Sequence, residues 1–256
     1  MDPRRIGICD SGVGGITVAR VLHQLLPEES ILFIGDSARN PYGNQTPEAI
    51  NTMAGELKRF LLAKKVKMII AACNTITFNV SSSFYEGSVP VQGMPLFLPE
   101  SIEGGISVFA TPATVQTHRY RDFLQASCPG AEVREVPFEG LADAIEKGRS
   151  PAELSRLIDR VIQEFHVPDR GQVILACTHY PLMTELFQQT LPHVVLHDPA
   201  VAAAKTAVRC LAERDGLAEE AVGSEFYFTA GAEGARKLIR PLFGEVPVKT
   251  AVLSGV

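Results

Sequence analysis

The sequence predicts an α/β protein made of two similar, open, mainly parallel sheets that face each other with pseudo-twofold symmetry. Short apolar runs alternate along the chain with amphipathic stretches, which is typical of parallel sheets covered by helices. One pattern also occurs twice. Ile69–Thr75 and Val173–His179 each contain four apolar residues, the last an alanine, then a cysteine and two hydrogen-bonding residues. A repeated strand-to-helix unit indicates two lobes of one design.

The first lobe follows this alternation closely. Strands are predicted at three apolar runs, residues 6–9, 31–35 and 66–72. The first run ends at Asp10-Ser11-Gly12 and leads into a helix over about 14–26. After the second run, Asn40-Pro41-Tyr42-Gly43 is a strong turn signal. Thr46 and Pro47 then mark the N-cap and the first position of another helix.

Proline, glycine and glutamate accumulate over 91–105, which predicts the crossing to a second lobe. Strands are predicted there at 106–110, 173–176 and 194–197, and Ser150-Pro151-Ala152-Glu153 is a capping box that begins a helix. The chain then continues with a helix over about 199–214, a strand over 225–229, a helix over about 233–242 and a last short strand. We expect residues 1–92 with about 206–256 to form the first domain, and 93–205 the second.

Composition excludes several classes of protein. The 256 residues are 46% hydrophobic, which is enough for a sizeable core, yet no apolar run reaches the length of a membrane span. The N-terminus lacks the pattern of a signal peptide, so a cytoplasmic location is expected. A net charge of −5 with scattered basic residues argues against nucleic-acid and membrane partners. The five cysteines form no Cys-x-x-Cys motif, and no histidine spacing requires a metal.

Cys73 and Cys177 are the candidate catalytic residues. Each follows a predicted parallel strand, where ligands of such sheets bind, and each precedes a predicted helix, which lowers a thiol pKa from about 8.5 and attracts carboxylates. Removing an alpha proton and returning one to the opposite face requires two acid–base groups. Asp10, on the neighbouring strand, and His179 are placed to assist them. The sequence therefore predicts racemisation of a small acidic amino acid.

Each of these signals has a simpler interpretation. A single cysteine at a strand end is commonly a small buried apolar residue, so the matched pair carries the prediction. Cys9, Cys128 and Cys210 lack any such context. Gly12, Gly14 and Gly15 suggest a dinucleotide site, but Thr17 occupies the next required glycine position. These glycines fit a close approach of the backbone to a carboxylate better, and no cofactor is expected.

Several blocks of the sequence resemble the signature blocks of glutamate racemases, in the same order. They are Asp10-Ser11-Gly12-Val13-Gly14-Gly15, Gly35-Asp36-Ser37-Ala38-Arg39 with Pro41-Tyr42-Gly43, Ala72-Cys73-Asn74-Thr75, Cys177-Thr178-His179-Tyr180-Pro181 and the segment 226–240. The resemblance covers nearly the whole chain. It implies a cofactor-independent isomerase that interconverts L- and D-glutamate by two thiols, supplies D-glutamate for peptidoglycan and forms a homodimer.

The resemblance also implies roles for individual residues. Cys73 and Cys177 would be catalytic, assisted by Asp10 and His179. Asp36 and Glu146 would be supporting carboxylates. Substrate contacts would come from Asp10, Ser11, Pro41, Tyr42, Gly43, Cys73, Asn74, Thr75, Thr114, Cys177, Thr178 and His179. No metal ligands are implied.

Two alternatives remain open from the sequence. One is a racemase of aspartate or another small acid, although aspartate racemases tend to carry an acidic residue where His179 stands. The other is a non-catalytic module that binds a small anion in the cleft. Circular dichroism of an amino-acid solution separates these two alternatives from a glutamate racemase, because each of the three functions predicts a different loss of optical activity.

Overall fold

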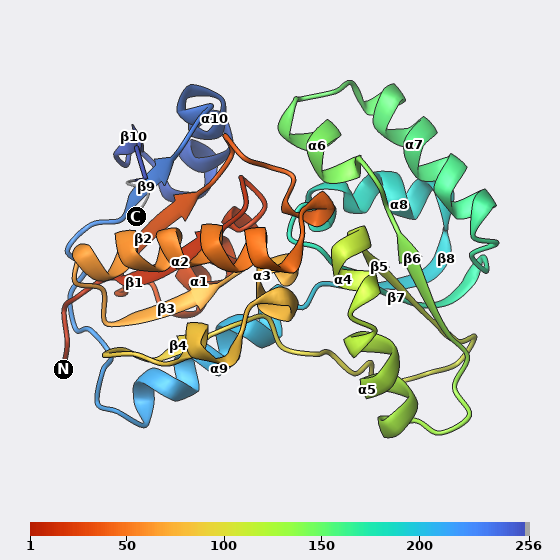
Figure 1. The fold of residues 1–256 in the computed structure, drawn as a ribbon, viewed down its shortest axis with the longest axis horizontal. Coiled ribbons are helices and arrows are strands. Elements are labelled where there is room, and N and C mark those ends of the chain that lie inside the picture. The colour runs from red at the N-terminus through yellow and green to blue at the C-terminus, as the bar shows by residue number, and fades with distance from the viewer. Residues whose placement is uncertain (254–256) are drawn as a thin grey trace.

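The computed structural model describes residues 1–253, which form two α/β lobes lying side by side (Figure 1). The lobe at the left of Figure 1 holds both ends of the described chain, and the green and teal lobe holds the middle. Within this range no helix has the length and apolar character needed to cross a membrane.

The first lobe contains a six-stranded parallel sheet in the order β10-β9-β2-β1-β3-β4. Its strands are β1 (Ile6–Asp10), β2 (Ile31–Gly35), β3 (Met68–Ala71), β4 (Val91–Gln92), β9 (Glu225–Phe228) and β10 (Val248–Thr250). Every residue of β1, β2 and β3 is buried. These strands are apolar almost throughout because helices cover both faces of the sheet.

Two groups of helices cover this sheet. Apolar residues of α1 (Ile16–Leu25), α9 (Ala200–Ala212) and α10 (Ala232–Phe243) pack on one face. Those of α2 (Pro47–Ala63) and α3 (Asn74–Asn79) pack on the other. The Thr46 side chain caps α2 by accepting from the Ala49 amide, as the sequence predicts.

The second lobe contains a four-stranded parallel sheet in the order β6-β5-β7-β8. Its strands are β5 (Ile106–Ala110), β6 (Val133–Pro137), β7 (Arg170–Ala176) and β8 (His193–His197). Its helices are α4 (Pro112–Gln116), α5 (Arg119–Ser127), α6 (Leu141–Glu146), α7 (Pro151–Glu164) and α8 (Thr184–Thr190). Both halves of the predicted capping box at Ser150 and Glu153 are present. The strand order repeats the order β2-β1-β3-β4 of the first lobe, so the repeat inferred from the two cysteine patterns is present in the topology.

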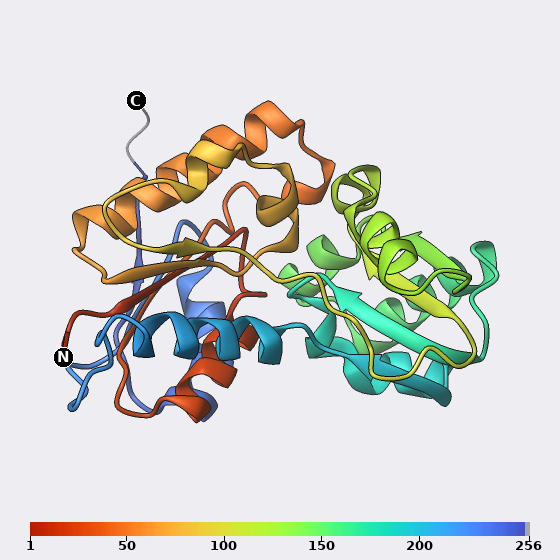
Figure 2. The same cartoon turned by 90° about the horizontal axis from the view of Figure 1, so that it is seen from below.

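Two segments connect the lobes, one after β4 and one before α9 (Figure 2). The first leads from β4 into β5. The second leads into α9, whose Ala200 and Ala203 already lie in the apolar cluster with α1. Ala203, Ala204 and Ala207 are fully buried on this helix, and their small side chains allow the close approach.

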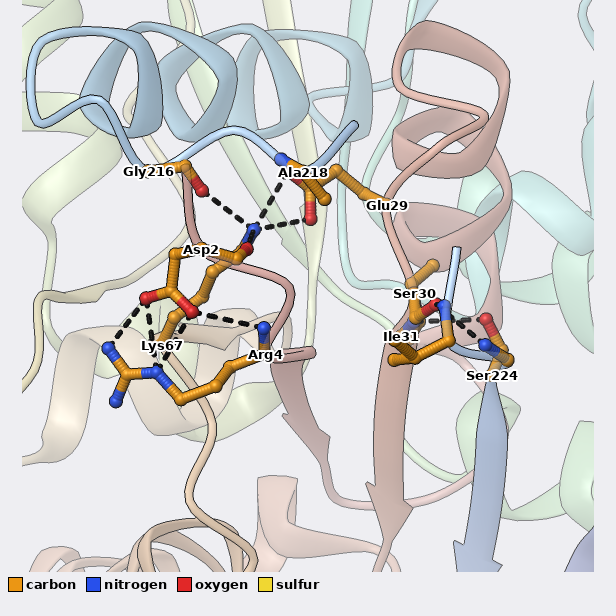
Figure 3. A network of polar contacts seen from close by, with 11 residues as sticks. Asp2, Arg4, Glu29, Ser30, Ile31, Lys67, Gly216, Ala218 and Ser224 are labelled. Atoms are coloured by element: carbon orange, nitrogen blue, oxygen red, sulfur yellow. Dashed lines mark hydrogen bonds and ion pairs between the residues drawn. The ribbon is translucent and has the colours of Figure 1, made fainter. Parts of the chain in front are cut away.

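A buried ion pair closes the first lobe at the amino ends of its strands (Figure 3). The Lys67 ammonium lies 2.7 Å from the Glu29 carboxylate and donates to the carbonyl oxygens of Asp2 and Gly216, each at 2.7 Å. Both charged side chains are 2% exposed. Several partners are needed to offset the desolvation of such a pair. This end of the sheet is therefore tied together, and the opposite, carboxyl end is left to carry a site.

Candidate active site

Both candidate cysteines lie at carboxyl ends of central strands. Cys73 is separated from the end of β3 by Ala72 and is the N-cap of α3, whereas Cys177 directly follows β7. Each is 5% exposed. The two sulfurs belong to different lobes, yet Cys177 is close enough to contribute to the pKa of Cys73. The facing sheets therefore bring the two thiols into one buried region.

Cys177 is the first member of a chain of three polar groups. Its sulfur lies 3.8 Å from Nδ1 of His179, and Nε2 of His179 lies 2.7 Å from Oε1 of Glu146. Burial alone would lower the pKa of His179, but its hydrogen bonds with Cys177 and Glu146 raise that pKa well above its usual range. A protonated His179 has an N–H group for each partner. A proton can therefore pass between the imidazole and the Cys177 sulfur.

Glu146 also links this chain of groups to the first lobe. Its Oε1 accepts from the Val13 amide at 2.5 Å, and its Oε2 accepts from the Ser37 hydroxyl at 3.2 Å. A Cβ on Gly12 would lie 1.8 Å from Oε1, so any other residue there would displace the Glu146 carboxylate. The glycine-rich turn thus allows the backbone to approach a carboxylate, which in this structure belongs to Glu146 of the other lobe.

Cys73 has a different environment. Its sulfur lies 3.5 Å from the Ser11 hydroxyl. Burial, followed by the nearby Asp10 carboxylate, raises the pKa of Cys73 to about 12. The expectation that a helix N-terminus lowers this pKa is therefore wrong for Cys73 in this structure, because desolvation outweighs the dipole of a six-residue helix.

Asp10, at the end of β1, is fully buried and connects the lobes. Its Oδ1 accepts from the Gly12 amide at 2.9 Å, and its Oδ2 accepts from the Thr178 hydroxyl at 3.0 Å. Burial raises the pKa of Asp10. Both oxygens are thus occupied by other partners, and Asp10 acts on Cys73 through its charge.

The residues after Cys73 line the same region. Thr75 lies 2.8 Å from the hydroxyl of Thr111 and 3.4 Å from that of Thr114, so these hydroxyls meet between the lobes. Asn74 is 2% exposed, and within the described chain neither its Nδ2 nor its Oδ1 has a hydrogen-bond partner. Orphan buried amides are costly. A polar ligand that reached Asn74 would remove this cost.

A loop after β2 completes the region. Tyr42 is buried and donates to Oδ2 of Asp36 at 2.5 Å. A Cβ on Gly43 would lie 2.6 Å from Cβ of Thr111, so this loop packs directly on the second lobe. Pro41, half-buried, precedes them.

Comparison with known proteins identifies the family. The family described as Asp/Glu/Hydantoin racemase matches residues 16–207. The chain belongs to this family. The glutamate racemase of Streptococcus gordonii is 34% identical over 258 residues, covering 96% of this chain and 97% of that protein.

Two crystal structures extend the comparison. That of a glutamate racemase isoform from Bacillus anthracis matches with a TM-score of 0.86 and 26% identity over 98% of each chain. That of the Francisella tularensis glutamate racemase, in complex with D-glutamate, matches with a TM-score of 0.83 and 29% identity over 99% of this chain and 98% of the other. The predicted fold class and the predicted enzyme class, an isomerase, are confirmed.

The racemase site includes three residues that the sequence did not single out. Ser37 binds Glu146, Thr111 binds Thr75, and Thr229 binds Asp36. Thr111 caps α4 before Pro112, and Thr229 follows β9, so both lie at carboxyl ends of strands. A hydroxyl residue at the carboxyl end of a parallel strand is therefore the sequence signal that indicates Thr111 and Thr229. Ser37 belongs to a quoted block, but its partner is distant in sequence.

A groove of this racemase reaches Glu146. It has a volume of about 1350 Å³ and is lined by parts of α6, α7, α8 and α10. Glu146 lines it, but neither Cys73 nor Cys177 does. In residues 1–253 no group of three His, Cys, Asp or Glu side chains is placed to hold a metal ion. Both thiols are 5% exposed and lie outside this groove, and we refer to this arrangement of the lobes as the closed form.

Proposed function

We propose that this protein is a glutamate racemase, which interconverts L- and D-glutamate with two thiols and no cofactor. One observation carries the proposal: two buried cysteines, one from each lobe, follow equivalent strands of two facing parallel sheets. Curated relatives such as that of Streptococcus gordonii bear this name, and the Francisella tularensis relative binds D-glutamate.

The mechanism assigns one thiol to each face of the substrate. With L-glutamate, the Cys177 thiolate takes the alpha proton and the Cys73 thiol gives its proton to the opposite face. With D-glutamate, Cys73 is the base and Cys177 is the acid. Each turnover moves a proton from one cysteine to the other, so the return reaction needs no outside reagent.

The neighbouring groups fit these roles. His179, held by Glu146, has a proton to share with Cys177. Ser11 donates to or accepts from Cys73, and the charge of Asp10 favours return of a proton to that sulfur. Asn74 and the threonine hydroxyls supply donors for substrate oxygens, which stabilises negative charge developing on the carboxylate side of the alpha carbon.

The wider biological setting follows from the substrate. A D-glutamate supply would serve peptidoglycan synthesis. A homodimer, a cytoplasmic location and the lack of nucleic-acid or membrane partners remain predictions from the sequence.

Circular dichroism tests the proposal directly. The ellipticity of L-glutamate, and that of D-glutamate, should decay to zero with the wild-type protein, because the two enantiomers are equal in free energy. L-Aspartate should be at least about a hundredfold slower, since its shorter side chain leaves buried polar partners unmatched. Rapid loss of the aspartate signal instead would identify an aspartate racemase. No loss from any acidic amino acid, with binding detected by calorimetry, would identify an anion-binding module.

A further inference from the structure

Thr229, immediately after β9, forms a bridge to the loop that follows β2. Its hydroxyl donates to Oδ1 of Asp36 at 2.7 Å and accepts from the Ala38 amide at 2.9 Å. Its own amide donates to the Gly35 carbonyl at 3.0 Å. Three hydrogen bonds thus join Gly35, Asp36 and Ala38 to a residue that lies almost two hundred positions later in the chain.

Asp36 extends this bridge to the residues expected to contact substrate. It is fully buried, and its second oxygen accepts from the Tyr42 hydroxyl at 2.5 Å and from Nε of Arg39 at 2.6 Å. Burial, followed by the Asp36 carboxylate, raises the pKa of Tyr42 well above its usual range, so the hydroxyl stays protonated and donates. Loss of the Thr229 donor would leave Oδ1 of a buried carboxylate without that partner.

The same loop carries Gly43 against Thr111 of the second lobe. A shift of Asp36 would move Tyr42, and with it the packing of Gly43 on Thr111. The position of Thr229 therefore bears on the part of the cleft formed by both lobes, although Thr229 itself is not placed among the expected substrate contacts.

We propose that Thr229 is a positioning residue for substrate binding, acting through Asp36 on Tyr42 and Gly43. This inference rests on the proposed function, and it adds the C-terminal strand β9 to the parts of the chain that set substrate affinity. Because the thiols belong to other elements, the bridge should affect binding more than proton transfer.

Thr229→Val tests the proposal, since valine keeps the shape and removes the hydroxyl. We expect KM for both enantiomers to rise about tenfold, with kcat changed less than about threefold, as for loss of one hydrogen bond to a charged group. Thr229→Ser should restore KM to within about twofold, because serine keeps a hydroxyl that both donates and accepts. Thr229→Ala replaces Thr229→Val if the valine variant does not fold.

Thr190→Val is the matched control. Thr190 donates to the Asp159 carboxylate at 2.8 Å in the second lobe, so this change removes a bond of the same kind away from the site. Its KM should stay that of the wild type. An unchanged KM in Thr229→Val, the same rise in Thr229→Ser, or an equal rise in Thr190→Val would overturn the inference.

Hydrogen–deuterium exchange separates this inference from the proposed function, because it needs no substrate. Amide exchange over residues 36–45 should accelerate at least about tenfold in Thr229→Val and stay unchanged in Thr190→Val. Local opening of this loop costs less free energy in Thr229→Val, because the hydrogen bonds of the hydroxyl are already absent. Unchanged exchange over 36–45 would contradict the bridge even in an active racemase. A wild-type protein without activity on glutamate would contradict the proposed function alone.

Discussion

The two candidate cysteines occupy equivalent positions in the topology but have different chemical surroundings. Cys73 and Cys177 follow corresponding strands, β3 and β7, and are equally buried. Cys177 has an imidazole beside it, which a carboxylate of the same lobe holds, whereas Cys73 has the Ser11 hydroxyl and the nearby Asp10 carboxylate. A repeated fold therefore places two sulfurs alike, and the residues after each strand decide how each sulfur handles a proton.

This difference sets the resting state of the closed form. The raised pKa of Cys73 keeps it a neutral thiol at neutral pH, and the raised pKa of His179 keeps a proton beside Cys177. A protonated Cys73 is the acid that the proposed mechanism requires for L-glutamate. The closed form is thus prepared for that direction, and the reverse direction requires Cys73 to lose its proton first.

The largest expected effect comes from replacing either thiol. Cys73→Ser and Cys177→Ser should each lower racemisation by at least about 1000-fold, because serine is not a competent base at neutral pH. Each variant should still eliminate from a glutamate analogue with a β leaving group, which needs one base. Cys73→Ser should act on the L-analogue and Cys177→Ser on the D-analogue. Both variants acting equally on both analogues would show a single-base mechanism, and full racemisation by either would remove that cysteine from the mechanism.

Glu146→Gln sharpens the comparison with an intermediate effect. Because Glu146 helps to raise the pKa of His179, the neutral amide should lower that pKa and move the alkaline limb of the kcat profile toward lower pH. We expect kcat for elimination from the L-analogue to fall between about tenfold and a hundredfold, since a charge-assisted bond is lost. The D-analogue, which uses Cys73, should be much less affected. Racemisation kinetics cannot show this asymmetry in kcat/KM. The equilibrium constant between L- and D-glutamate is one, so kcat/KM must be the same in both directions.

Ser37→Ala is the control for Glu146→Gln. It removes the partner of Oε2 and leaves the bond from Oε1 to His179. If kcat for elimination from the L-analogue fell as much in Ser37→Ala as in Glu146→Gln, the cause would be a shift of α6 and not the loss of charge beside His179.

Alkylation gives the smallest but most direct comparison. With its pKa raised to about 12, Cys73 is almost fully protonated at pH 7, and its rate of reaction with iodoacetamide should keep rising through pH 9 to 11. The same cysteine in the urea-unfolded protein should show a midpoint near about 8.5. Peptide mass spectrometry of the 68–80 region measures both. A midpoint below that of the unfolded protein would show that the thiol is activated, as the position before a helix alone suggests.

The sequence was informative where the signal is local. Apolar runs placed the central strands, and Thr46 and Ser150 placed the starts of two helices. The repeated cysteine pattern indicated two lobes, because equivalent strands end in equivalent residues. The packing of the α9 alanines on α1 is a contact between distant segments, which no local pattern predicts.

Two features of the site could not be predicted from the sequence. The pKa of Cys73 depends on how completely the closed lobes exclude water, which no pattern of neighbouring residues specifies. The bridge from Thr229 to Asp36 joins residues that are far apart in the chain, so one sequence shows neither partner beside the other. Expected contacts such as Asn74 and Thr75 were found through the family resemblance, and the structure supplies their physical setting.

The interrupted layout of the first lobe has a consequence for synthesis on the ribosome. All four strands of the second lobe have been synthesised by His197, whereas β2 meets its neighbour β9 only after residues 225–228 are made. Helices α9 and α10 share their face of the first sheet with α1, and α10 is made only after β9. Translation therefore completes the inserted lobe before the lobe that contains the first residues, which reverses the usual order in which domains fold during synthesis. A nascent chain paused between residues 200 and 225 would lack β9 and β10 of the first sheet, although every strand of the second lobe has been synthesised.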